Sequence, residues 1–152
     1  MTLKFPVHIP FVEQLGFELH AVGEGEAELQ LDLAEAHLNS WAVAHGGVVM
    51  TLLDVAMAHA ARSIHRRELP EGGLDWGPGV VTIEMKTSFM RPGEGRLRAQ
   101  ARLLHRSSTM AFCEGSVLGG DGKLCAHATG TFKYLKALPG RDRAIKALQR
   151  RD

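Results

Sequence analysis

One acid, Asp54, stands within a long apolar segment of the sequence. Residues 47–64 contain no Pro and are apolar over most of their length, so they predict a buried helix rather than a strand. The side chains three and four positions away on such a helix carry no positive charge; they are Met50, Thr51, Met57 and Ala58. A carboxylate placed there loses hydration without gaining an ion pair, which raises its pKa and suits a catalytic group. The alternative is a solvated Asp at the edge of the helix.

The start of the same helix offers a complementary feature. The sequence His45-Gly46-Gly47 places residues without side chains where the first N–H groups of a helix have no acceptor within the helix. A polarised oxygen can approach such N–H groups closely, as in the oxyanion hole of an acyl-transfer enzyme. Alternatively, the glycines only allow a tight turn into the helix.

The spacing of these two features predicts how they could meet. His45 and Asp54 are nine positions apart, which corresponds to about 13 Å along a helix and to nearly opposite sides of it. Within one chain they cannot act on the same carbonyl. Two antiparallel helices related by a two-fold axis would bring the start of one helix to the acid of the other. We therefore predict a homodimer with two composite sites, and the sequence leaves open whether dimers pair further into a tetramer.

Alternating apolar and polar residues predict an antiparallel sheet around the helix. A short helix or turn at 9–16 precedes a hairpin of 17–21 and 27–33, and 68–79 is a loop rich in Gly and Pro. Four strands follow without another helix between them: 81–89, 97–103, 109–118 and 124–134. A sheet with one apolar face buries that face by curling around the long helix, which is the hotdog arrangement of the α+β class.

Length and composition fit one domain. The 152 residues, 45% of them hydrophobic, predict a single domain over 1–152 with its core at about 10–135. The basic tail at 138–152 could form a short helix, and we give it no role. The net charge of +1 gives no electrostatic reason to bind nucleic acid or an anionic membrane. No signal peptide or membrane-spanning segment is evident, so we expect a cytoplasmic protein.

The sequence contains no pattern typical of a metal site. Cys113 and Cys125 are too few and too far apart for a zinc site, and in the cytosol we expect both to be free thiols. Four histidines do not occur with acids at the spacing of metal ligands, so packing or surface positions explain them best: His59, His65, His105 and His127.

Several motifs together carry a resemblance to a known family. Asn39, the His45-Gly46-Gly47 motif and Asp54 resemble the active-site signature of hotdog thioesterases of the phenylacetic-acid-degradation type, close to the family of the mammalian acyl-CoA thioesterase 13. The segments 79–92 and 105–132 resemble the strand after the central helix and the last hairpin of that family. The likeness spans roughly residues 10–135.

The resemblance implies a role for each matching position. Asp54 would be the nucleophile or the general base, and Thr82 of the same subunit would help to position water. Asn39, His45 and the backbone N–H of Gly46 would come from the partner subunit and polarise the thioester carbonyl or steady the leaving group. The reaction requires no metal or other cofactor, because coenzyme A is part of the substrate.

The resemblance also implies contacts to coenzyme A and to the acyl group. Candidates for the phosphates, because Arg and hydroxyl groups suit phosphate oxygens, are Arg91, Arg106, Ser107 and Ser108. Solvated loops are the alternative reading of these positions. For the acyl group we expect contacts to Gly47, Met50, Met57 and the loop around Trp76.

Two hypotheses of different classes follow. The first is a homomeric acyl-CoA thioesterase, and the second is a non-catalytic hotdog module that binds acyl-CoA. Asp54 separates them, because a binding module has no reason to place a carboxylate beside a thioester. A hotdog dehydratase is a weaker option, since the sequence lacks the usual His and acid pair of that class.

Overall fold

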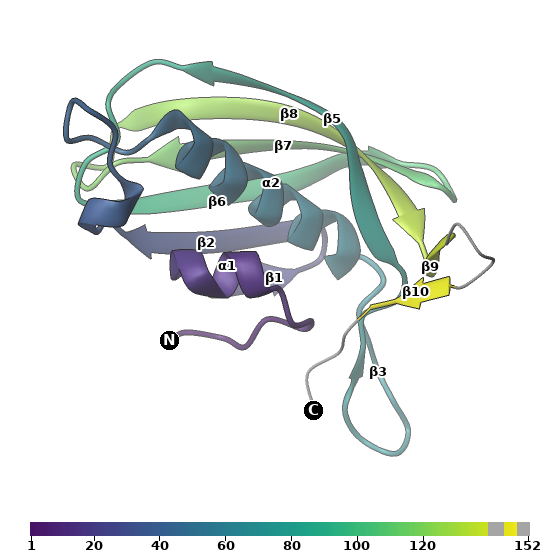
Figure 1. The fold of residues 1–152 in the computed structure, drawn as a ribbon. Coiled ribbons are helices and arrows are strands. Elements are labelled where there is room, and N and C mark those ends of the chain that lie inside the picture. The colour runs from purple at the N-terminus through teal and green to yellow at the C-terminus, as the bar shows by residue number, and fades with distance from the viewer. Residues whose placement is uncertain (140–144, 149–152) are drawn as a thin grey trace.

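A computed structural model describes residues 1–139 and 145–148 of the chain. The described residues contain a six-stranded sheet in the order β1-β2-β6-β7-β8-β5, with the helix α2 (Gly46–Ser63) lying across one face (Figure 1). All neighbouring strands of this sheet are antiparallel, and they are β1 (Glu18–Gly23), β2 (Glu26–Asp32), β5 (Gly79–Phe89), β6 (Arg96–Arg106), β7 (Met110–Leu118) and β8 (Leu124–Leu135). The hotdog fold expected from the sequence is confirmed.

The strands expose alternate residues because their sequences alternate. In β2 and β6 the apolar pairs Leu29↔Ala99 and Leu31↔Leu97 face the core, and the polar residues between them face outward. This period of two matches the predicted pattern. The same alternation continues through β7 and β8, so the sheet has one apolar face from β2 to β8, whereas the edge strand β5 is largely exposed.

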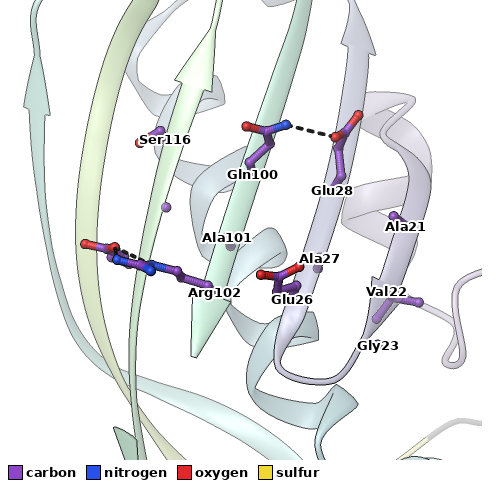
Figure 2. Close-up of a pocket in the computed structure, with 12 residues that line it drawn as sticks. Ala21, Val22, Gly23, Glu26, Ala27, Glu28, Gln100, Ala101, Arg102 and Ser116 are labelled. Carbon is purple, nitrogen blue, oxygen red and sulfur yellow. Dashed lines mark hydrogen bonds and ion pairs between the residues drawn. The ribbon is translucent and has the colours of Figure 1, made fainter. Parts of the chain in front are cut away.

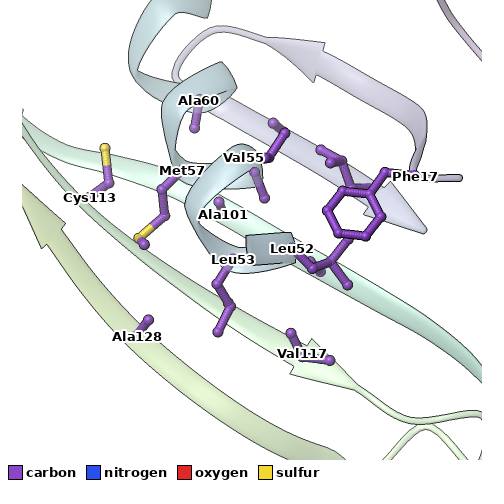
Figure 3. Packing of buried hydrophobic residues seen from close by; sticks show 14 of the residues in the cluster. Phe17, Leu52, Leu53, Val55, Met57, Ala60, Ala101, Cys113, Val117 and Ala128 are labelled. Atoms are coloured by element: carbon purple, nitrogen blue, oxygen red, sulfur yellow. The ribbon is translucent and has the colours of Figure 1, made fainter. Parts of the chain in front are cut away.

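The helix packs closely on the sheet because the facing strand positions are small (Figure 3). A Cβ atom added at Gly115 would lie 3.2 Å from Leu53, and one added at Gly130 would lie 3.1 Å from Met57. Leu53 and Met57 are both fully buried, and burying a side chain of this size stabilises a fold by roughly 1.5–3 kcal/mol. The expectation that Met57 contacts an acyl group is therefore wrong, because the sheet covers it.

The smaller elements agree with the sequence at the N-terminus and differ from it elsewhere. The predicted short helix is α1 (Pro10–Leu15), and the hairpin that follows is β1 and β2. Within the predicted loop, β3 (Arg67–Glu68) and β4 (Leu74–Asp75) form a small hairpin, because Gly72 and Gly73 turn the chain with φ of 90° and 93°.

The tail does not form the short helix that the sequence suggested over the part described. Instead, β9 (Ala137–Pro139) pairs with β10 (Ile145–Ala147), so the backbone hydrogen bonds of these segments run between strands. Residues 140–144 and 149–152 of the tail lie outside the described residues.

Both cysteines are free and buried, as expected, and burial raises the pKa of the Cys113 thiol to about 12. His59 donates from Nδ1 to the carbonyl of Val55 (2.7 Å), and the His65 ring packs edge-on against Tyr134 at 4.8 Å. Within residues 1–139 and 145–148, no group of three or more His, Cys, Asp or Glu could hold a metal ion. No helix in the same ranges is long and apolar enough to cross a membrane.

Candidate functional site

The carboxylate of Asp54 is held by a single side chain from the neighbouring strand. Asp54 lies midway along α2, and the Thr82 hydroxyl of β5 donates a hydrogen bond of 2.6 Å to its Oδ1. The family resemblance implied that Asp54 and Thr82 of one subunit act together, and the two side chains are in contact within this chain. Because the hydroxyl contacts only Oδ1, it leaves Oδ2 available for another partner.

The position of Asp54 is electrostatically unusual. The side chain is half-buried, and no cation forms an ion pair with it in the described part of the chain. Burial raises the pKa of the Asp54 carboxyl above its ordinary value, and the hydrogen bond from Thr82 opposes this rise. A carboxylate with a raised pKa is a better proton acceptor than an ordinary aspartate, which suits a general base.

The start of α2 presents one free N–H group rather than two. His45 is the N-cap residue, and its Nδ1 accepts a hydrogen bond of 2.9 Å from the backbone N–H of Gly47. In the neutral ring the proton therefore lies on Nε2, which is left as a donor. The N–H of Gly46 makes no hydrogen bond to any described residue. The oxyanion donor predicted from the glycine pair is thus Gly46, whereas Gly47 serves the cap.

One residue that the sequence analysis did not single out, His37, holds this helix start in place. The buried His37, in the short 3-10 helix η1 (Glu35–His37), accepts at Nδ1 from the N–H of Ala34 (2.9 Å) and donates from Nε2 to the carbonyl of Leu15 (2.8 Å). Its own carbonyl accepts from the N–H of His45 at 2.8 Å. The sequence alone does not reveal this supporting role of His37, because it does not show that the loop carrying His37 and Asn39 folds back on itself.

Asn39 is occupied mainly by its own loop. Its Oδ1 accepts from the N–H of Trp41 (2.9 Å) and more weakly from the N–H of Val43 (3.4 Å). These two N–H donors identify the oxygen of the amide, so the Nδ2 group is left as the donor that faces outward. The side-chain oxygen of Asn39 therefore serves the turn, and the amide NH₂, which makes no hydrogen bond within the described residues, remains available to a ligand.

A pocket of about 510 Å³ opens at this start of α2. Asn39, Gly46 and Arg91 line it, and its remaining walls are largely apolar, with Phe89 and Val49 among them. The ring of Phe89 lies beside Gly46, where an added Cβ would be 3.5 Å from ring atoms. The pocket therefore combines a free N–H group, an amide and a cation with hydrocarbon walls.

Asp54 does not line this pocket. It lies eight positions beyond Gly46, or about 12 Å along the helix axis, beside the other half of β5. Met50 lies between them on α2 and is partly exposed, but it does not line the pocket. One chain therefore carries an acid half and a donor half that are separated, as the spacing predicted.

The residues expected to bind phosphates do not form one cluster within the chain. The N–H of Arg91 donates to the carbonyl of Cys125, at the end of the sheet where α2 begins. Burial lowers the pKa of His65, and the nearby charge of Arg106 lowers it further, so the 106–108 turn lies at the opposite end, where α2 finishes. Ser107 Oγ in this turn accepts from the N–H of Met110 at 3.0 Å. Only Arg91 lies beside the pocket.

Trp76 also lies far from the pocket, because its ring packs under Arg66 beyond the end of α2 with the guanidinium carbon 5.4 Å from the ring centre. The expectation that the loop around Trp76 contacts the acyl group is not met within one chain.

The 570 Å³ hollow of Figure 2 lies on the outer face of the sheet. Its polar groups bond to each other, as Gln100 does to Glu28 (3.1 Å), and it contains none of the predicted site residues.

Comparisons with known proteins identify a family and several relatives of this chain. Residues 42–126 match the family profile described as Thioesterase superfamily. The chain is 30% identical over 135 residues to the medium/long-chain acyl-CoA thioesterase YigI of Salmonella typhimurium, covering 84% of this chain and 87% of that protein. Conserved protein PA5202 from Pseudomonas aeruginosa has a similar structure, with a TM-score of 0.75, 32% identity and coverage of 86% of this chain and 97% of that one. A mutant of the phenylacetic acid degradation protein PaaI from Thermus thermophilus matches with a TM-score of 0.69, 30% identity and coverage of 84% and 100%.

Proposed function

The chain belongs to the thioesterase superfamily and is a thioester hydrolase, and we propose that it cleaves acyl-CoA to the free acid and coenzyme A. The observation that carries the proposal is the half-buried carboxylate of Asp54, held by Thr82 and without a cation beside it in the described residues. The relative named as a medium/long-chain acyl-CoA thioesterase supports the same substrate class.

The proposed reaction assigns one task to each half of the site. The ionised Asp54 takes a proton from the attacking water or attacks the thioester carbonyl carbon itself, and Thr82 holds the carboxylate in position. Negative charge develops on the carbonyl oxygen, where the N–H of Gly46 and the Nδ2 group of Asn39 can donate to it. The carbon–sulfur bond then breaks, and the coenzyme A thiolate leaves and takes up a proton, which in the general-base route is the one that Asp54 took from water. If Asp54 itself has attacked, water then hydrolyses the acyl–Asp54 anhydride and releases the free acid. His45 contributes its Nε2–H at the same end.

We infer that the two halves come from different subunits. β5 pairs only with β8 among the described strands, so the opposite edge of an eleven-residue strand is open. An exposed edge of this length is a ready template for pairing with another chain. The exposed side of α2 next to this edge carries Gly47, Met50 and Thr51, which are mostly small. A second copy that continued the sheet at β5 would lay its own α2 antiparallel to the first.

The alternative of a non-catalytic binding module explains less. Burial of Asp54 disfavours its charged form, so the residue does not help the fold at neutral pH. Binding of an acyl-CoA would be served better by an apolar residue at this position. Of the residues expected to contact phosphates, Arg91 is the one that lies beside the pocket.

The test is the Asp54→Asn variant. Asn has the same shape and can still accept from Thr82, so the fold is preserved while the base is removed. We expect thiol release from acyl-CoA to fall at least about 100-fold, the usual effect of losing a general base. Thermal unfolding at neutral pH should be unchanged or shifted upward, because an unfavourable buried charge is gone.

A matched control is Asp32→Asn, which removes a carboxylate that pairs with Arg96 on the outer face of the sheet. Its rate should stay within about twofold of the original, as expected for an exposed ion pair. Equal rates for Asp54→Asn and the original protein across short, medium, long and aryl acyl-CoAs would show that Asp54 is not the catalytic group.

A further inference from the structure

Trp41 is the most exposed aromatic side chain beside the candidate site. It lines the pocket at the start of α2 together with Gly46 and Asn39, and 84% of its surface is accessible. A single exposed apolar side chain is ordinary, whereas a contiguous exposed apolar patch commonly marks a binding surface. Phe89 and Met90 line the same pocket and are also exposed, so the apolar surface is continuous around the free N–H of Gly46.

The loop that carries Trp41 is held in a specific conformation. The Oδ1 atom of Asn39 accepts from the N–H of Trp41, and the N–H of Ala42 donates to the carbonyl of Asn39 at 3.0 Å. Ala42 has a φ of 58°, which is uncommon for a residue with a Cβ atom. Local hydrogen bonds therefore hold the backbone that places Trp41 at the pocket, despite the strain at Ala42, and strain of this kind concentrates at ligand sites.

On the basis of the proposed function, we propose that Trp41 is a specificity-determining residue that packs over the acyl chain of the substrate. The acyl chain would lie in the pocket of the subunit that supplies Gly46, between Trp41 and Phe89. The pantetheine arm of coenzyme A fits this position poorly, because its amide groups need polar partners along their length. The polar groups of the pocket are instead gathered at Asn39 and Gly46, where the thioester carbonyl belongs, and at Arg91.

The first experiment measures kcat/KM for saturated acyl-CoAs from acetyl to dodecanoyl with Trp41→Ala. We expect a change below about twofold for acetyl-CoA and a loss of about tenfold or more for the longest chains, because contact with apolar surface contributes for each buried methylene group. Trp41→Leu should restore most of the activity toward long chains. Phe11→Ala is the matched control, since Phe11 is 60% exposed on α1 and does not line the pocket.

The second experiment reports binding without hydrolysis. The chain contains two tryptophans, so Trp76→Phe leaves Trp41 as the only indole, and Trp76 lies beyond the opposite end of α2. Thioether analogues of acyl-CoA, which cannot be hydrolysed, should shift Trp41 emission to shorter wavelength by an amount that grows with chain length. Coenzyme A alone should produce no shift.

These outcomes separate the inference from the proposed function. A protein that releases no thiol but shows the chain-length-dependent emission shift would contradict the proposed function and support the role of Trp41. Hydrolysis that depends on Asp54, combined with emission that does not respond to the analogues, would overturn the role of Trp41. A loss shared equally by all chain lengths in Trp41→Ala, with conversion of a dimer to monomers, would also overturn it by assigning the side chain to a subunit interface.

Discussion

At the scale of single residues, the chemistry depends on how few partners Asp54 has. The hydroxyl of Thr82 is the only described side chain that bonds to it, and that bond lowers the pKa which burial raises. Ionised Asp54 is the active form in the proposed reaction. Activity should therefore be lost as the pH falls through a pKa that lies above the ordinary aspartate value.

Thr82→Val tests this balance. The variant removes the donor that stabilises the carboxylate, so the acid limb of the kcat/KM profile should move to higher pH. Thr87→Val is the control, because Thr87 lies on the same face of β5 and its hydroxyl has no hydrogen-bond partner in the described part of the chain. A limb that stayed in place or moved to lower pH in Thr82→Val would contradict the proposed role of the hydrogen bond.

The sequence indicated which residue types could carry the proposed chemistry but not how their atoms are arranged. Asn39, Gly46 and Asp54 are recognisable from their types and spacing. The pattern could not show that Gly47 gives its N–H to His45, or that Asn39 gives its oxygen to the turn around Trp41. Those assignments depend on loop dihedral angles, which the sequence does not specify.

At the scale of elements, the long helix and the strands followed from periodicity alone. α2 begins at Gly46 because His45 caps it, one residue before the predicted start. The pattern did not reveal which side of α2 meets the sheet. The prediction that Met57 contacts the acyl group is wrong for this reason, because Met57 lies under β7 and β8. The 106–108 turn was likewise grouped with Arg91, since the sequence gives no distance between the ends of a sheet.

The open edge of β5 leads to a prediction at this scale. Ile83 lies at the bulge of β5 and is 53% exposed, so Ile83→Lys places a charge on the edge that we expect to be covered by a second copy. Sedimentation at micromolar concentration should show conversion to monomers and a parallel loss of activity. Leu104→Lys is the control, because Leu104 is 51% exposed on β6, which has a neighbouring strand on both sides. This variant should remain dimeric and active. A dimer that is unaffected by Ile83→Lys would place the interface elsewhere.

At the scale of the whole molecule, one chain has an acid half and a donor half that do not meet. A site built from two copies explains why Asp54 and Gly46 both lie on α2 yet are separated by about 12 Å along its axis. This arrangement also gives the long open strand a partner. The central claim is therefore that each active site takes its carboxylate from one subunit and its oxyanion donor from the other.

Hybrid dimers test this claim most directly. Gly46→Pro removes the N–H donor and keeps the helix start, because Pro is well tolerated at the first helical position and His45 already has an extended backbone with ψ of 136°. Gly46→Ala, which keeps the N–H, is its control. Asp54→Asn and Gly46→Pro homodimers should each be inactive. When the two are unfolded together in equal amounts and refolded, about one quarter of the original sites should be intact and active, since half of the dimers are hybrids with one complete site each. Confirmed hybrids with no activity above that of the two parents would contradict the account.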